Sequence, residues 1–132
     1  MKVLILGSGA KDHAITWLFS KSRRISGLFI APGNAGTAML GTNLPAIDIS
    51  SPESVAEACR KYNISYVFAG TESPLANGVP DYLRSLGIRT FGASSNTMRL
   101  EGDRSFARTF SDRYNIPTSR YTAFSTLADF KT

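Results

Sequence analysis

An apolar run that breaks directly into a glycine turn is the feature that most constrains this chain. Residues Val3–Leu6 are continuously apolar, and Gly7-Ser8-Gly9 follows them without a spacer. A helix-compatible stretch, Ala14–Ser20, comes next. In α/β proteins this order holds a phosphate, because glycines let backbone N–H groups approach the anion and the helix N-terminus adds partial positive charge. The sequence therefore predicts an α/β fold with an anion-binding turn near its start.

The glycine turn does not match the dinucleotide-binding fingerprint. That fingerprint has a third glycine where this chain has Asp12, and an acidic residue near the end of the second strand, where this chain runs into Ala31-Pro32-Gly33-Asn34. We therefore expect no NAD site. A carboxylate suits a helix start, so a capping role for Asp12 competes with a ligand-binding role.

Length and composition indicate a globular domain. The chain has 132 residues, with 42% hydrophobic and 19% charged residues, which favours one domain with its own core. No apolar segment approaches the ~20 residues of a membrane span, and the N-terminus does not resemble a signal peptide. Cys59 is the single cysteine and lies in a helical pattern, so we expect a packed thiol and a cytoplasmic location.

The net charge of +5 favours an anionic partner, either a nucleic acid or a phosphorylated small molecule. Acidic residues interrupt the basic ones, and there is no basic run or RNA-binding aromatic signature, so we expect no nucleic-acid partner. His13 has no second histidine, cysteine or acidic cluster near it in the sequence. A packed or hydrogen-bonded histidine is therefore favoured over a metal ligand, and no metal site is expected.

Apolar segments alternate with helical patterns along the chain. The expected strands span residues 2–6, 27–31, 43–49, 64–69 and 88–91, and the expected helices span 13–21, 50–63 and 74–86. Pro80 is expected to break the last helix or delay its start, and Trp17 is expected to belong to the core. The pattern predicts an open five-stranded, mainly parallel sheet with helices on both faces.

Three polar, glycine-rich loops follow expected strands. They are residues Gly7–Asp12 (the first loop), Pro32–Thr37 (the second loop) and Gly70–Pro74 (the third loop). Because parallel sheets bind ligands outside the carboxyl ends of their strands, all three should open on one edge. The alternative for each is a loop that only turns the chain, but three at one edge favour a binding site.

The pattern changes after Phe91. Residues Ser94–Tyr114 are helical but broken at Gly102-Asp103, where Asp103 can cap a second helix, and Arg120–Phe124 resembles a new strand. A lone strand with a short tail cannot build a second core. We therefore expect a Rossmann-like domain over residues 1–101, followed by the beginning of a second domain over residues 102–132.

The three loops and two later segments together resemble one family, the phosphoribosylamine–glycine ligases (glycinamide ribonucleotide synthetases), which are ATP-grasp enzymes of purine synthesis. The matching segments, in chain order, are GSGAKDHA from Gly7, PGNAGTA from Pro32, GTESPL from Gly70 with Gly78-Val79, FGAS from Phe91 with LEGDRSFA from Leu100, and Ile116-Pro117-Thr118. The resemblance covers essentially the whole chain at the family's spacing. It implies a Rossmann-like pre-ATP-grasp domain and the start of an ATP-grasp domain.

The chain departs from the family pattern at a few positions. Residues 10, 11 and 12 are Ala, Lys and Asp where the family motif has Gly, Arg and Glu, and Thr71 replaces a proline. The lysine ammonium is a compact charge on a flexible chain, whereas the arginine guanidinium is planar and can donate two parallel hydrogen bonds. Arg104 stands where the family has a lysine that approaches nucleotide phosphates, so the resemblance gives Arg104 a nucleotide-binding role.

The resemblance implies a ligase that makes glycinamide ribonucleotide from 5-phosphoribosylamine, glycine and ATP. Glycine's carboxylate attacks the ATP γ-phosphate, and the amine of phosphoribosylamine then displaces phosphate from glycyl phosphate. ATP and Mg²⁺ (or Mn²⁺) would serve the full-length enzyme. This chain alone would be inactive, would bind neither tightly, and would contribute a site for the phosphoribosyl group. The partners would be these small molecules, with no nucleic acid and no membrane, and a monomer is favoured.

The expected substrate-binding residues all lie in the three loops: Gly7, Ser8, Gly9, Lys11, Asn34, Gly36, Thr37 and Glu72. Those of the first loop would form a phosphate or ribose cradle. Those of the second would offer amide, backbone and hydroxyl contacts, and Glu72 would accept from ribose hydroxyls or an ammonium group. The sequence identifies no catalytic residue. The alternative function is a non-catalytic nucleotide- or phosphate-binding module.

Overall fold

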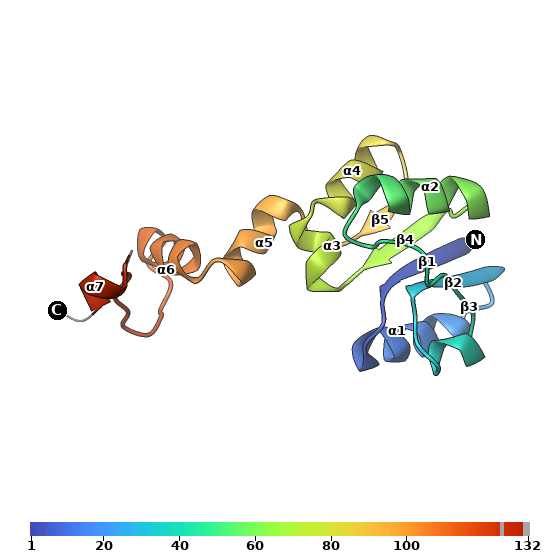
Figure 1. The fold of residues 1–132 in the computed structure, drawn as a ribbon, viewed down its shortest axis with the longest axis horizontal. Helices are drawn as coiled ribbons and strands as arrows, with labels where there is room; N and C mark the ends of the chain where they lie inside the picture. The colour runs from blue at the N-terminus through green and yellow to red at the C-terminus, as the bar shows by residue number, and fades with distance from the viewer. Residues whose placement is uncertain (125, 131–132) are drawn as a thin grey trace. The chain divides into compact units, whose positions relative to one another are not determined.

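Five parallel strands form one sheet in the computed structural model, which describes residues 1–124 and 126–130. The strands are β1 (Lys2–Gly7), β2 (Gly27–Pro32), β3 (Thr42–Asn43), β4 (Tyr66–Ala69) and β5 (Thr90–Phe91). Their order in the sheet is β3-β2-β1-β4-β5, so the chain starts in the middle and winds outwards in both directions (Figure 1). The predicted open parallel α/β sheet is confirmed.

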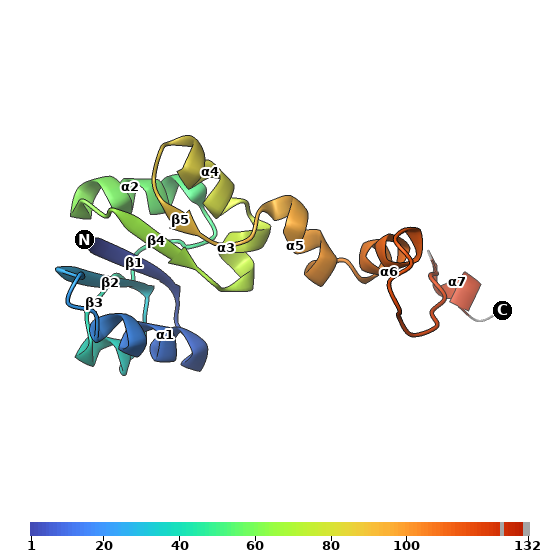
Figure 2. The ribbon, with the colours of Figure 1, turned by 180° about the vertical axis from the view of Figure 1, so that it is seen from behind.

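Helices cover both faces of the sheet. Helix α1 (Ala10–Ser20) and the short η1 (Thr37–Met39) lie on one face; α2 (Pro52–Tyr62), α3 (Glu72–Ala76) and α4 (Val79–Ser85) lie on the other (Figures 1 and 2). This arrangement follows from the strand order. Right-handed crossovers towards β2 and β3 place helices on one face, and crossovers towards β4 and β5 place them on the opposite face.

The core is built around β1, whose residues Val3–Leu6 are all fully buried. Val3 and Ile5 pack with Leu28 and Ile30 of β2 on the α1 side. Because side chains alternate along a strand, Leu4 and Leu6 point to the opposite face. Burial on both faces explains why β1 is a continuous apolar run rather than an alternating one.

The helix boundaries follow local capping chemistry. The Ser51 hydroxyl accepts a hydrogen bond from the Ser54 N–H (3.2 Å) at the start of α2, and Asn63 ends that helix in the left-handed conformation (φ 54°). The predicted interruption of the helix after β4 is also found. It lies at Gly78 (φ 71°), and Pro80 occupies the first turn of α4, where its missing N–H costs nothing.

Three sequence expectations are wrong. The third strand ends at Asn43 rather than Ile49, because residues 44–51 are turns and irregular backbone that carry Pro45. Trp17 is 52% exposed rather than part of the core, because Asp12 and Thr16 occupy the inward side of α1. Residues Arg120–Phe124 form no strand.

The chain divides into two compact units, Met1–Asn96 and Thr97–Thr132. The helices beyond the sheet are α5 (Ser95–Gly102), α6 (Arg104–Arg113) and α7 (Leu127–Phe130). The predicted break at Gly102-Asp103 is present, and the Asp103 carboxylate caps α6 by accepting from the Phe106 N–H (2.9 Å). No helix among the described residues is both long and apolar enough to span a bilayer.

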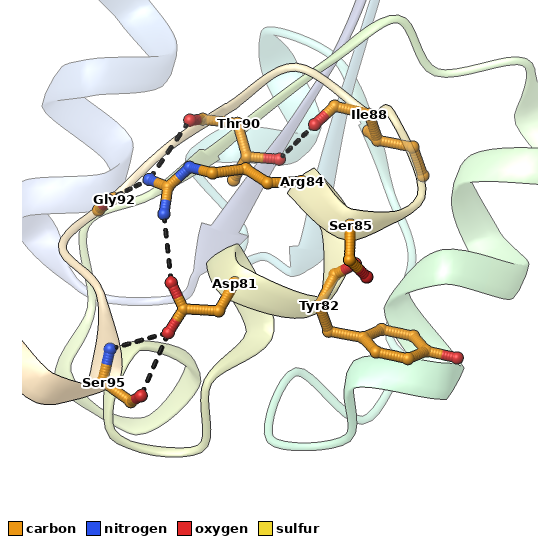
Figure 3. Close-up of polar contacts among 8 residues, drawn as sticks. All are labelled: Asp81, Tyr82, Arg84, Ser85, Ile88, Thr90, Gly92 and Ser95. Carbon is orange, nitrogen blue, oxygen red and sulfur yellow. Dashed lines mark hydrogen bonds and ion pairs between the residues drawn. The ribbon is translucent and has the colours of Figure 1, made fainter.

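Ser95, the first residue of α5, is joined to α4 by hydrogen bonds to Asp81. Asp81 accepts from the Ser95 N–H (2.8 Å) and hydroxyl (3.0 Å), and its other oxygen lies 3.3 Å from the Arg84 guanidinium (Figure 3). Arg84 also donates to the carbonyl oxygen of Gly92. These hydrogen bonds hold the segment between β5 and α5 within the first unit.

Candidate functional site

The three glycine-rich loops lie at one edge of the sheet, as predicted. The first loop follows β1, the second loop begins at the last residue of β2, and the third loop follows β4. All three strands are parallel, so their carboxyl ends meet at the same edge. The strand order reverses direction between β1 and β4, and such switch points are where open α/β sheets bind ligands.

The first loop is held by the buried carboxylate of Asp12, which is 3% exposed. Its Oδ2 accepts from the Gly9 N–H (3.0 Å), and its Oδ1 lies 3.1 Å from the Thr71 hydroxyl of the third loop. Gly7 has a φ of +146°, and a Cβ there would lie 2.2 Å from the carboxylate. The capping alternative for Asp12 is therefore confirmed, because this side chain closes the start of α1.

The second loop is held by neutral groups. The Asn34 N–H donates to the Thr37 hydroxyl (2.8 Å), and the Thr37 N–H donates back to Asn34 Oδ1 (2.9 Å). Asn43 at the end of β3 completes the network, because its Nδ2 donates to the Asn34 carbonyl (2.7 Å) and its Oδ1 lies 2.8 Å from the Thr37 hydroxyl. Thr37 is fully buried, so the network sits beneath the loop rather than on its surface.

Direct hydrogen bonds join the loops to one another. Asn34 Nδ2 donates to the Ser8 carbonyl (2.8 Å), which ties the second loop to the first. Lys11 Nζ donates to the Gly70 carbonyl (2.5 Å), which ties the first loop to the third. The Thr71 hydroxyl also lies 3.0 Å from the carbonyl oxygen of Leu6 at the end of β1. The edge is therefore one connected polar surface.

His13 packs against the second loop. A Cβ at Gly36 would lie 2.6 Å from the imidazole Cε1, so the ring rests directly on the glycine backbone. No group of three or more His, Cys, Asp or Glu residues able to hold a metal ion occurs among the described residues. The packed histidine that the sequence favours is therefore found.

Glu72 is the first residue of α3 and is exposed. Beside it, the hydroxyl oxygens of Ser73 and Ser50 are 2.6 Å apart, so the segment between β3 and α2 also reaches this edge. Lys11 supplies an ammonium group, Glu72 a carboxylate and Ser8 a hydroxyl, all three on exposed residues. This set can bind a ligand that carries both an anionic and a hydroxyl- or amine-bearing part.

The structure brings together eight of the nine predicted binding residues, all in the first unit: Gly7, Ser8, Gly9, Lys11, Asn34, Gly36, Thr37 and Glu72. The side chains of Asn34 and Thr37 are engaged inside the second loop, and their contact with a ligand stays a prediction. Arg104 belongs to the second unit, where it lines a shallow groove with Arg108 and Glu101.

Sequence reasoning missed two residues that shape this edge, Thr71 and Asn43. Thr71 precedes α3 as its N-cap, a position that a threonine before an acidic helix start could have indicated. Asn43 lay inside a segment assigned to a longer strand.

Cys59 lies outside the site, and burial raises the pKa of its thiol to about 11, which suits a packed residue rather than a nucleophile.

Comparison with known proteins gives a consistent relationship. Residues 1–101 match the family model described as phosphoribosylglycinamide synthetase, N domain. The chain is 41% identical over 124 residues to a phosphoribosylamine–glycine ligase of Neisseria meningitidis, covering 94% of this chain and 29% of that protein. It is 39% identical over 125 residues to the human trifunctional purine biosynthetic protein adenosine-3, covering 94% of this chain and 12% of that protein.

A solved structure shows the same relationship. The crystal structure of phosphoribosylamine–glycine ligase from Thermotoga maritima superposes with a TM-score of 0.66 at 32% identity, covering 91% of this chain and 26% of that one. The chain thus spans less than a third of the length of these relatives. On its sequence, its fold and the loops at the carboxyl edge of its sheet, the chain belongs to the phosphoribosylglycinamide synthetase N-domain family.

Proposed function

We propose that this chain is the substrate-binding N-terminal part of a phosphoribosylamine–glycine ligase, in which it holds the phosphoribosyl group of 5-phosphoribosylamine. One observation carries the proposal: the three family loops meet at the β1–β4 switch point and are joined by the Asn34–Ser8 and Lys11–Gly70 hydrogen bonds. A preformed edge lowers the ordering cost of binding a small ligand.

Lys11 and Glu72 give the proposed site its selectivity. The Lys11 ammonium offers charge-assisted hydrogen bonds to a phosphate, and the Glu72 carboxylate accepts from ribose hydroxyls or from the substrate's amine. Ser8 and Gly9 are exposed and carry between them only one hydroxyl beyond Cβ, so the sugar can approach the backbone of the first loop closely.

The ligase reaction and its cofactors belong to this proposal too. ATP and Mg²⁺ (or Mn²⁺) would act in the full-length enzyme, where bound ATP activates glycine's carboxylate. Arg104 begins α6, and its guanidinium suits a nucleotide phosphate. A cytoplasmic location, small-molecule partners and the domain division at 101/102 complete the proposal.

Amide chemical shifts of the isotope-labelled chain test the binding site. Millimolar glycinamide ribonucleotide should shift amides in residues 7–11 and 33–37, whereas NAD should leave them unmoved. Lys11→Gln should weaken binding by about tenfold, the loss expected for one charge-assisted hydrogen bond. The matched control Lys21→Gln, at the other end of α1, should bind as the unmodified chain does. Silence of both loops at millimolar glycinamide ribonucleotide would refute the site, and an NAD response would favour a nucleotide-binding module.

A second experiment tests the division of labour. We expect this chain alone to form no ADP in the presence of ATP, glycine and phosphoribosylamine. ADP formation that depends on both glycine and phosphoribosylamine would show that these residues suffice for catalysis and would overturn the assignment as a binding part.

A further inference from the structure

The Asp12 carboxylate lies where an anion would bind to the glycine turn. Among the residues whose side chains the structure describes, it is the one buried carboxylate. It takes the Gly9 N–H at 3.0 Å and lies directly over Gly7, where an added Cβ would be 2.2 Å from its Oδ2. A phosphate bound at a glycine turn needs the same two things, a free N–H donor and open space over a glycine.

The carboxylate is fixed in this place from a second direction. Its Oδ1 lies 3.1 Å from the Thr71 hydroxyl, at the start of α3. Lys11, the cation of the first loop, does not pair with it, because Lys11 Nζ instead donates to the Gly70 carbonyl. The carboxylate is therefore held by the loops themselves, and the lysine is left facing the edge.

We propose that the Asp12 carboxylate is an internal anion that fills the phosphate seat of the glycine turn, meaning the space over Gly7 beside the Gly9 N–H. It thereby determines which part of a ligand the turn can bind. The turn then admits the ribose part of a ligand and excludes a phosphate or a bridging pyrophosphate from the Gly9 N–H. This rests on the proposed phosphoribosyl site, and it decides between the two roles of the first loop in favour of ribose. The ligand's phosphate is left to Lys11.

Inorganic pyrophosphate is the probe for the seat, read at the Gly9 amide. In the unmodified chain, millimolar pyrophosphate should leave this amide unmoved. Asp12→Gly vacates the seat and restores a third glycine, so the amide should shift saturably. Pyrophosphate affinity should rise at least about tenfold, as expected for one hydrogen bond to a charged group. A saturable Gly9 shift in the unmodified chain would overturn the proposal, and this measurement does not depend on any variant folding.

Two further variants separate occupancy from charge. Asp12→Asn keeps the seat filled without a charge, so its Gly9 amide should stay silent; a gain equal to that of Asp12→Gly would overturn occupancy. Glu57→Gln removes one negative charge from an exposed position on α2 and should leave the Gly9 amide unmoved by pyrophosphate, as in the unmodified chain. If Asp12→Gly does not fold, Asp12→Ala vacates the seat with a residue that favours the helix.

Glycinamide ribonucleotide distinguishes this inference from the proposed function. If glycinamide ribonucleotide shifts the amides of the second loop and pyrophosphate leaves the Gly9 amide unmoved, the proposed function and the role of Asp12 are both supported. If that ligand leaves every loop silent, the proposed function fails, whereas the pyrophosphate result still decides the role of Asp12.

Discussion

The first and second loops sit side by side at one edge of the sheet but are held by different chemistry. The first depends on a single buried carboxylate, Asp12, which reaches across to the third loop. The second depends on the neutral side chains of Asn34, Thr37 and Asn43. In both, side chains that look like ligand-binding groups in the sequence maintain the shape of the loop. The ligand contacts proposed above are then left to the backbone and a few exposed side chains.

The largest expected effect tests the close packing of the first loop. Gly7→Ala would place a Cβ 2.2 Å from the Asp12 carboxylate at a φ of +146°. We expect a loss of about 3 kcal/mol or more in the free energy of unfolding, from overlap and backbone strain together. Urea unfolding measures this loss.

Gly87→Ala is the matched control, because Gly87 also has a positive φ (+76°) but no atom lies within 4 Å of the added Cβ. It should cost only about 1 kcal/mol. Equal losses for the two variants would mean that Asp12 moves aside freely and that the first loop is not tightly packed.

The second loop should respond to the loss of one hydroxyl. Thr37→Val keeps the shape of a fully buried side chain but leaves the Asn34 N–H and Asn43 Oδ1 without their partner. We expect a loss of about 2 kcal/mol in the free energy of unfolding, with the Asn34 amide exchanging faster. Thr109→Val on exposed α6 is the control and should change stability by less than about 0.5 kcal/mol. A Thr37→Val variant as stable as this control would contradict the network.

A smaller effect tests the contact that His13 of α1 makes with the second loop. Gly36→Ala would bring a Cβ to 2.6 Å from the imidazole, and the ring can give way at a cost of about 1 kcal/mol. In a His13→Ala background the same substitution should cost markedly less. A double-mutant cycle on urea unfolding measures this coupling, and strict additivity would show that the ring does not rest on the second loop.

The smallest expected effect is a loss of stability at alkaline pH, which should come from a group outside the loops. The second-loop network has no titrating side chain, so alkaline pH should act on stability through other groups. The folded-state pKa of Cys59 is raised from 9.0 to about 11 by burial, so the folded chain holds this proton more tightly than the unfolded chain. This contribution is full below pH 9 and is lost as the pH rises towards 11.

Replacing the thiol isolates that contribution. The free energy of unfolding of Cys59→Ala should therefore fall less steeply between pH 9 and 11 than that of the unmodified chain. Identical slopes would show that the thiol is not perturbed. Alkylation of Cys59 near neutral pH should likewise be slow until the chain unfolds.

Much of the fold could be predicted because its elements carry strong local signals. The apolar run before Gly7, the Ser51 cap and the Asp103 cap mark elements that the structure contains. The third strand was overextended because alternating side chains also occur in turns, and only two residues pair with β2. Trp17 was misplaced because two polar residues, Asp12 and Thr16, take the inward face of α1. The Thr16 hydroxyl donates to the Asp12 carbonyl.

The sequence predicted the position of the candidate site more accurately than the contacts among its residues. Glycine motifs indicated which loops meet, because topology alone brings the carboxyl ends of β1, β2 and β4 together. They could not show that Asn34 and Thr37 bond to each other, since that depends on the loop's three-dimensional path and on Asn43 from another strand. Long-range partners of this kind leave no periodic signal in a single sequence.

The Lys11–Gly70 hydrogen bond has a consequence for the kinetics and entropy of recognition. A surface lysine ordinarily samples many rotamers and loses about 0.5–1.5 kcal/mol of free energy when a ligand immobilises it. Here one internal carbonyl already restrains the side chain. An arriving phosphate would exchange one acceptor for another on an ammonium group that is already aimed. If Lys11 binds the ligand's phosphate as proposed, the phosphate would have to displace the Gly70 carbonyl, which would favour strong hydrogen-bond acceptors.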